Sequence, residues 1–458
     1  MEQDVFLRLI AGALPELQSA FAKLPSLSPV GDEAAMERVL ATVAGRMVDN
    51  YPYFHPLYAG QMLKPPHPVA RAAYAMAMWL NPNNHALDGG KASSQMEVEA
   101  VRAIAAMFGW ESFLGHLTSG GTFANLEALW IAGQLAPEKK IVASAQSHYT
   151  HKRISSVLQL PFDAIATDAR GRMDMDALES VLKVGDVGTV VVTLGTTAMG
   201  AVDTLDEVLA LRERYEFRIH VDAAYGGYFK LASNLGEEAR RAFDRIAEAD
   251  SIVVDPHKHG LQPYGCGCVL FRDPGVGRFY KHDSPYTYFT SSELHLGEIS
   301  LECSRAGASA VALWATQQLL PLVPGGEFAR GLEDGRKAAQ ELYSQISCEE
   351  RFITGFAPEL DILVWAVRAD SVEESSRLAQ VVFDKTAELD LHLALVQTPV
   401  SFFQSIDIEK NSPLRLWTYN GEGDRMVTCL RSVLMKPEHL QWVDEIAKRL
   451  FQALEETD

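Results

Sequence analysis

The sequence lacks the patterns that mark secreted, membrane-spanning and metal-binding proteins. Its five cysteines are an odd number and are scattered without the CxxC spacing of a zinc site, so we expect reduced thiols and no metal centre. No uninterrupted apolar run is long enough to cross a bilayer, and the first residues lack the basic and then apolar pattern of a signal peptide. We therefore expect a cytoplasmic protein.

Positive charge is also scarce. The 458 residues carry 41 Lys and Arg against 60 Asp and Glu, which gives a net charge of -19. This acidic balance argues against nucleic acid and anionic membranes as partners, because both attract basic surfaces. With 47% hydrophobic and 22% charged residues, the composition is that of a globular enzyme large enough for more than one structural unit.

The central part of the chain alternates between short apolar strands and helical segments. Strands are expected at 140–146, 162–167, 189–194, 218–222, 251–255 and 267–271. This alternation predicts an α/β fold with a mainly parallel sheet that helices cover on both faces. Before these strands, Ser94 and Glu97 have the spacing of a capping box, which predicts that a helix begins there and continues through Phe108.

Reactive side chains follow three of the predicted strands. His148 comes after the first strand, Asp222 ends the fourth, and Lys258 follows Pro256, which closes the fifth. Because the carboxyl ends of parallel strands meet at one edge of a sheet, we expect these three groups to converge there. Each has an ordinary explanation when taken alone, such as a helix cap or a surface lysine. Together they favour a functional site.

A turn rich in glycine and hydroxyl groups, Ser119-Gly120-Gly121-Thr122, precedes an apolar helix. Backbone N–H groups at such a turn suit a phosphate, although the turn is neither a Walker A motif nor a GxGxxG fingerprint and is a weak signal alone. A phosphate site, an amine that can form an imine, a carboxylate and a stacking imidazole are what pyridoxal 5′-phosphate requires. The set therefore indicates this cofactor.

The chain resembles the group II pyridoxal-phosphate-dependent amino-acid decarboxylases, which include aromatic-L-amino-acid, tyrosine and glutamate decarboxylases. The similarity extends over most of the sequence, and the order and spacing of its motifs are more specific than any single one. The motifs are Ser119-Gly-Gly-Thr122, His148, Thr193-Leu-Gly-Thr196-Thr197, His220-Val-Asp222-Ala-Ala-Tyr225, Pro256-His257-Lys258 and Leu430-Arg431-Ser-Val-Leu-Met-Lys-Pro437. The resemblance implies fold type I, the aspartate-aminotransferase-like fold, with a large α/β domain and a small α+β domain at the C-terminus.

Three segments follow from these patterns and from the resemblance. Residues 1–90 are expected to be a helical and extended segment that wraps a dimer partner, 91–325 the large cofactor-binding domain, and 326–458 the small domain. The proline-rich stretches Tyr51–Pro56 and Lys64–Pro68 can form neither a regular helix nor an interior strand. The resemblance further implies a homodimer with the site at the subunit interface.

Roles in the family transfer to this chain by motif. Lys258 is implied to hold the cofactor as an imine, Asp222 to pair with its pyridine nitrogen, and His148 to stack on its ring. Arg431 is implied to bind the substrate carboxylate through its bidentate guanidinium. Apart from the resemblance, we expect His85 to line the substrate pocket. The cofactor contacts implied by the resemblance are Gly120, Gly121, Thr122, His148, Thr196, Asp222, Ala224, His257, Lys258 and Ser304.

One segment departs from the family's pattern. In the family, a tyrosine on a mobile loop returns a proton during catalysis. Counted forward from Lys258, that position falls at Tyr286 or Tyr288, whereas counted back from Arg305 it falls at His295. We place His295 slightly ahead because imidazole titrates near neutral pH, and both tyrosines remain candidates for proton donors or packing residues.

The expected activity is decarboxylation of an L-amino acid to its amine and CO2. We favour an aromatic substrate slightly, because an acidic side chain would need an additional dedicated cation in the site and we find none among the motifs. An aldehyde-forming oxidative deaminase, an aminotransferase and a carbon–carbon lyase on the same fold are the alternatives. A cofactor-binding dimer without catalytic activity is a further one, but it would not require the imine lysine.

Overall fold

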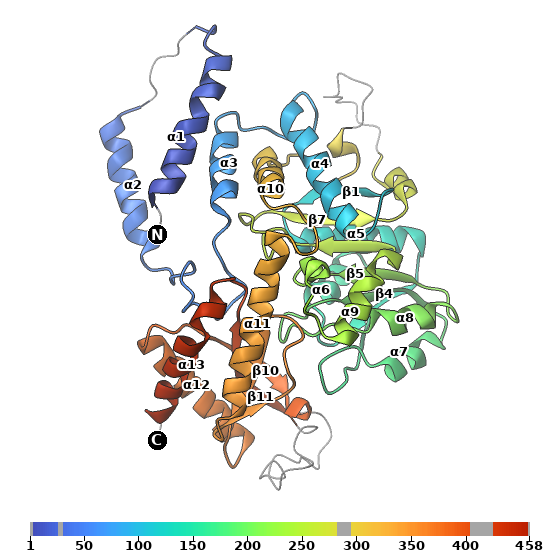
Figure 1. Cartoon of the computed structure of the whole chain (residues 1–458). Helices are drawn as coiled ribbons and strands as arrows, with labels where there is room; N and C mark the ends of the chain where they lie inside the picture. The colour runs from blue at the N-terminus through green and yellow to red at the C-terminus, as the bar shows by residue number, and fades with distance from the viewer. Residues whose placement is uncertain (1–2, 26–30, 282–294, 404–424, 457–458) are drawn as a thin grey trace.

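The computed structural model describes residues 3–25, 31–281, 295–403 and 425–456. Figure 1 shows a large α/β unit, a smaller unit below it that contains the C-terminal helices, and a pair of N-terminal helices on one side. The boundaries at residues 90 and 325 remain predictions.

A seven-stranded sheet forms the centre of the large unit, in the order β1-β7-β6-β5-β4-β2-β3. Its strands are β1 (Leu114–Thr118), β2 (Lys140–Ser144), β3 (Phe162–Ile165), β4 (Val187–Thr193), β5 (Arg218–Asp222), β6 (Ser251–Val254) and β7 (Gly267–Phe271). The strands from β6 to β3 pair in parallel, whereas β7 runs antiparallel to both β6 and β1. The predicted fold class, a mainly parallel α/β sheet, is confirmed.

Helices cover this sheet, so its central strands are buried along nearly their whole length. All residues of β4 are buried, as expected for a strand that has no face towards water. The helices of this unit are α4 (Lys91–Met107), α5 (Gly121–Leu135), α6 (Thr150–Val157), α7 (Met175–Leu182), α8 (Leu205–Arg212), α9 (Glu237–Asp244) and α10 (Gly307–Leu319).

The start of α4 corrects the predicted capping box. The helix begins at Lys91, with Gly90 at the N-cap and no side-chain cap, so Ser94 and Glu97 lie inside it. Glu97 is 1% exposed and accepts hydrogen bonds from Asn84 Nδ2 (2.7 Å) and from the N–H of Leu117 (3.0 Å). The carboxylate of Glu97 therefore makes tertiary contacts and does not cap the start of its own helix.

The smaller unit is an antiparallel sheet packed against helices, in the strand order β10-β11-β9-β8. Its elements are α11 (Glu327–Ser347), β8 (Phe352–Thr354), β9 (Ile362–Val367), α12 (Val372–Glu388), β10 (Ala394–Pro399), β11 (Met426–Val433) and α13 (His439–Glu455). The fully buried Trp365 belongs to the core between this sheet and its helices. This is the α+β organisation predicted for the C-terminal part, although 404–424 lie outside the described residues.

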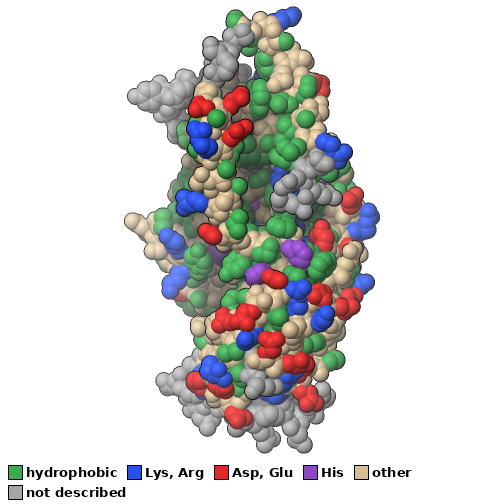
Figure 2. All heavy atoms as spheres, turned by 90° about the vertical axis from the view of Figure 1, so that its left-hand side faces the viewer, with side chains coloured by type: hydrophobic (Ala, Val, Ile, Leu, Met, Phe, Trp, Pro, Cys, Tyr) green, Lys and Arg blue, Asp and Glu red, His purple; other side chains and the backbone are tan. Residues whose placement is uncertain are grey.

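The N-terminal helices are α1 (Gln3–Ala20), α2 (Glu33–Met47) and α3 (Pro68–Met78). Helix α1 contacts α3, but no residue of α2 is buried. Figure 2 shows hydrophobic side chains gathered along α1 and α2. On α2 they include Met36, Val39, Leu40, Val43 and Met47, each between 47% and 66% exposed. Within the described ranges, no helix is both long and apolar enough to span a membrane.

Candidate active site

A cavity of about 450 Å³ lies at the edge of the large sheet where β1, β2, β4, β5 and β6 end. Each of these strands delivers side chains to it from the loop at its carboxyl end, as expected for an open α/β sheet. The lining residues are Ser119, Gly120, Gly121, Thr122, Phe123, Asn125, His148, Thr150, Thr193, Gly195, Thr197, Asp222, Ala224, Tyr225, Asp255, His257 and Lys258. The volume is typical of a site for a small molecule.

One wall of the cavity is the N-terminal turn of α5. Gly120 precedes the helix with a φ of 150°, which favours glycine at this position. A Cβ atom added to Gly121 would lie 2.5 Å from Asp255 Oδ2, so only glycine allows this close approach. The first N–H groups of a helix have no partner within it, and they carry a partial positive charge. The turn therefore forms a cradle for an anion.

Asp222 ends β5 and is held by His151, which lies on α6. The distance from His151 Nε2 to Asp222 Oδ2 is 2.7 Å, and the other oxygen, Oδ1, accepts a hydrogen bond from the N–H of Ala224 (3.1 Å). Burial by itself raises the pKa of Asp222. The hydrogen bond from His151 and the nearby charge of Lys258 outweigh it, so the pKa lies well below its ordinary value. Asp222 is therefore a carboxylate at neutral pH.

His148 follows β2 and lines the same cavity. Its Nδ1 lies 2.8 Å from Thr150 Oγ1, which fixes the orientation of the ring. Burial lowers the pKa of His148, although the charge of Asp222 acts in the opposite direction. The imidazole is consequently neutral at neutral pH and offers a flat face to the cavity.

Lys258 follows β6 and its side chain is 22% exposed. Its Nζ lies 3.2 Å from Asp255 Oδ2. His257 lies beside this pair, with Nε2 3.6 Å from Asp255 Oδ2 and Nδ1 hydrogen-bonded to the carbonyl oxygen of Cys266 (2.8 Å). The cavity thus contains one amine, two carboxylates and two imidazoles.

A loop after β4 closes another side of the cavity. Arg431 on β11 holds this loop by hydrogen bonds to its backbone. Arg431 is 4% exposed and donates to the carbonyl oxygens of Thr197 (2.7 Å) and Ala198 (3.0 Å). Its Nη1 lies 3.3 Å both from the carbonyl oxygen of Gly60 and from Oε1 of Gln61. The guanidinium therefore connects the N-terminal segment, the small unit and this loop.

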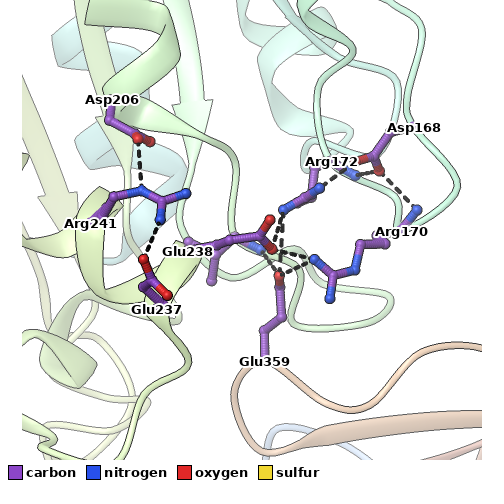
Figure 3. Close-up of polar contacts among 9 residues, drawn as sticks. Asp168, Arg170, Arg172, Asp206, Glu237, Glu238, Arg241 and Glu359 are labelled. Carbon is purple, nitrogen blue, oxygen red and sulfur yellow. Dashed lines mark hydrogen bonds and ion pairs between the residues drawn. The ribbon is translucent and has the colours of Figure 1, made fainter.

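The far end of the same loop is held by a group of ion pairs, shown in Figure 3. Glu359, which precedes β9, accepts a hydrogen bond from the N–H of Val202 (2.7 Å) and lies 3.9 Å from both Arg170 and Arg172. Both arginines also pair with Glu238 on α9. These contacts connect the small unit to the large one next to the loop that lines the cavity.

The structure brings together most of the residues predicted for the site. Those that line the cavity are Gly120, Gly121, Thr122, His148, Asp222, Ala224, His257 and Lys258. Thr197 lines it in place of Thr196, whose hydroxyl is buried and accepts a hydrogen bond from the N–H of Ala201 (3.0 Å). The functions predicted for these residues stay predictions.

Three other predicted residues, His295, His85 and Ser304, are described by the structure but do not line this cavity. His295 is 1% exposed, and its Nδ1 accepts a hydrogen bond from the N–H of Leu87 (3.0 Å). His85 accepts the N–H of Gly297 at its backbone carbonyl (3.0 Å). Ser304 is exposed and lines a second cavity of about 290 Å³, which shares Ser119 with the first. Tyr286 and Tyr288 lie outside the described residues.

Sequence reasoning assigned no task to His151 or Asp255. His151 lies in the first turn of α6, three residues after His148, and its N–H donates to the carbonyl oxygen of His148 (3.1 Å). Asp255 occupies the last position before Pro256, at the same sheet edge as Asp222. Their positions were visible in the sequence, but the direction of each side chain was not.

The residues of the cavity fit pyridoxal phosphate. The α5 turn suits a phosphate, Lys258 provides an amine, and Asp222 is a buried carboxylate that stays ionised. Two buried oxygen atoms that face this space, Thr193 Oγ1 and Asp255 Oδ1, have no hydrogen-bond partner among the described residues. Buried polar atoms normally have hydrogen-bond partners, and a polar ligand in this cavity would supply them.

Comparisons with known proteins agree with this chemistry. Residues 78–365 match the model of the pyridoxal-dependent decarboxylase conserved domain. The chain is 25% identical to an L-tyrosine decarboxylase of Enterococcus faecium, over 83% of this chain and 81% of that protein. It is 26% identical to an L-2,4-diaminobutyrate decarboxylase of Acinetobacter baumannii, over 88% of this chain and 84% of the relative.

The fold is also that of a solved structure with this cofactor. The crystal structure of Oryza sativa TDC with PLP and tryptamine superimposes with a TM-score of 0.76, at 16% identity, and the match covers 100% of this chain and 98% of the other. A family model that spans more than half of the sequence, together with a cavity that fits the cofactor, establishes the family. The chain belongs to the pyridoxal-dependent decarboxylases, carboxy-lyases that use pyridoxal phosphate to act on amino acids.

Proposed function

We propose that this protein decarboxylates an aromatic L-amino acid to its amine and CO2, with Lys258 as the residue that attaches the cofactor. The observation that carries the proposal is the meeting of Lys258, Asp222 and His148 in one cavity with the α5 cradle. When bound, pyridoxal phosphate supplies an electron sink for the pair left by the departing CO2.

The protein's own groups prepare this chemistry. Lys258 Nζ lies 3.2 Å from Asp255 Oδ2, and this contact holds the amine in the cavity, where it can react with the cofactor's aldehyde. Asp222 stays ionised and can keep a proton on the pyridine nitrogen, which strengthens electron withdrawal. His148, uncharged and fixed by Thr150, can pack against a flat ring without adding positive charge.

The preference for an aromatic substrate is supported by the charges around the cavity. Among the residues that the structure describes as lining it, Lys258 is the only Lys or Arg, so a carboxylate side chain on the substrate has no second cation to pair with. The similarity to an L-tyrosine decarboxylase points the same way.

A panel of the twenty common amino acids and L-2,4-diaminobutyrate tests this proposal. We expect CO2 release to be fastest with tyrosine, tryptophan, phenylalanine or a hydroxylated relative, with the amine identified by mass. Lys258→Ala provides the control without activity. Release of CO2 only from acidic or basic amino acids would overturn the substrate class, and aldehyde with ammonia as the main product would favour an oxidative deaminase.

We further propose that the protein is a cytoplasmic homodimer whose N-terminal helices pack against the partner subunit. The apolar side of α2 is exposed in the single chain, and burial of such a surface favours association. All five cysteines are free, which suits a reducing compartment. In sedimentation experiments we expect a dimer, and Leu40→Glu with Val43→Glu should weaken it. A monomer with full activity would contradict the proposal.

A further inference from the structure

Asp255 is a buried carboxylate in the cavity, and its contact with Lys258 Nζ does not explain why it also faces the α5 turn. Its side chain is 3% exposed, Oδ2 lies 3.2 Å from Lys258 Nζ, and Oδ1 has no hydrogen-bond partner among the described residues. A buried carboxylate normally accepts several hydrogen bonds, since an uncompensated charge is costly to remove from water. The position of Asp255 therefore needs a reason.

The position is directly in front of the anion cradle. A Cβ atom on Gly121 would lie 2.5 Å from Asp255 Oδ2 and 2.9 Å from Oδ1, so the carboxylate faces the first turn of α5. The partial positive charge of that turn stabilises Asp255. The same turn is the part of the cavity best suited to the cofactor's phosphate. Two anionic groups therefore share one positive helix end.

The neighbouring imidazole does not neutralise this carboxylate. His257 uses Nδ1 in the contact with the carbonyl oxygen of Cys266, so in the neutral ring the nitrogen that faces Asp255 carries a lone pair. Burial lowers the pKa of His257, which favours that neutral ring. Lys258 is then the cation nearest to Asp255 in the described cavity.

We propose that Asp255 is a positioning residue with a second effect: it holds Lys258 Nζ in place and weakens binding of the phosphate. In this arrangement the carboxylate keeps the amine in the cavity before the cofactor arrives. Its negative charge then repels the phosphate across the α5 turn, so pyridoxal phosphate binds less tightly than the cradle alone would allow. The inference rests on the family's cofactor and not on which amino acid is the substrate.

The test compares pyridoxal phosphate with pyridoxal, which lacks the phosphate, on the cofactor-free protein. Dissociation constants are measured by absorbance and tryptophan fluorescence for the wild type and Asp255→Asn. Because the substitution removes one unit charge close to the phosphate, we expect pyridoxal phosphate to bind roughly 10- to 100-fold more tightly. Pyridoxal should change by no more than about threefold, or weaken through loss of the contact with Lys258.

Two further measurements separate the two effects of Asp255. In a Lys258→Ala background, where no covalent attachment is possible, Asp255→Asn should still tighten binding of inorganic phosphate, measured by calorimetry. Asp244→Asn is the matched control, because it removes the same charge from an exposed side chain that pairs only with Lys230 and Arg240 in the described structure. It should leave both affinities unchanged, and thermal midpoints check that all variants fold.

The proposal is overturned if Asp255→Asn weakens pyridoxal phosphate, or if it tightens pyridoxal phosphate and pyridoxal equally. It is also overturned if phosphate binding in the Lys258→Ala background does not respond to the substitution. None of these readouts requires turnover, so a protein that decarboxylates no amino acid in the panel could still confirm or refute the function of Asp255.

Discussion

Removing the imidazole of His151 should turn Asp222 from a stabilising group into a destabilising one. His151 Nε2 lies 2.7 Å from Asp222 Oδ2, with side-chain exposures of 0% and 6%. Burial raises the pKa of Asp222, and the hydrogen bond from His151 is the first effect that opposes it. His151→Leu removes this hydrogen bond and leaves the burial in place, so the pKa of Asp222 should rise in the variant.

The two proteins should then respond oppositely to pH. In the wild type the pKa of folded Asp222 is depressed, so its contribution to stability is present above the ordinary Asp value of about 3.9 and is lost as the pH falls below it. In His151→Leu the carboxylate destabilises the folded protein at neutral pH, and this cost shrinks as the pH falls towards the raised pKa. Breaking a buried pair costs about 3–5 kcal/mol, and this lowers the thermal midpoint of a unit of this size by on the order of 10 °C.

The assay is the thermal midpoint of the cofactor-free wild type, His151→Leu and His151→Gln between pH 5 and 8. The glutamine keeps an N–H donor and should recover part of the loss. The difference between wild type and His151→Leu should be largest at pH 8 and should narrow towards pH 5. A difference that stays constant over this range would mean that the cost is lost packing, and it would refute the coupling between the two side chains.

Three further outcomes follow from named contacts. Borohydride reduction and peptide mapping should place the cofactor on Lys258, and a label on any other lysine would overturn the site assignment. Gly121→Ala should weaken binding of pyridoxal phosphate at least about tenfold, because a Cβ 2.5 Å from the buried Asp255 Oδ2 would displace the α5 turn that forms the anion cradle, whereas Gly45→Ala, with nothing within 4 Å, should not. Burial lowers the pKa of Lys436 to about 7, so stability should rise with pH between about 7 and 10, by about 1.4 kcal/mol per unit from this group, and Lys436→Met should flatten that slope in thermal midpoints.

The strands and the edge that carries the site could be predicted because both depend on local sequence. Apolar runs rich in β-branched residues are separated by helical segments, and reactive side chains stand where β2, β5 and β6 end. The antiparallel direction of β7 was not predicted. The connection from Val254 to Gly267 contains no helix, and a parallel return normally needs one. That connection instead carries Lys258, so the loop that turns the chain back also forms the site.

What the sequence did not reveal are the partners that tertiary packing supplies. Glu97 has the spacing of a capping residue, yet it is buried against Asn84 and Leu117. Arg431 was expected to meet a substrate carboxylate, whereas in the structure it contacts backbone carbonyls of the loop after β4. A guanidinium with several donors can serve either purpose, and only the fold determines which acceptors are within reach.

The two carboxylates of the cavity show why local pattern is not enough to assign function. Asp222 ends β5 and Asp255 comes directly after β6, so their positions in the sequence pattern are alike, and both side chains are buried. Asp222 is paired with His151, a residue outside the reacting set, and its charge can stay in place while the cofactor is bound. Asp255 is paired with Lys258, the amine that we propose attaches the cofactor, and it faces the α5 turn that we propose binds the phosphate. Under the proposed roles, the first carboxylate can support the bound cofactor throughout, whereas the second loses its contact with the free amine of Lys258 whenever the cofactor is attached.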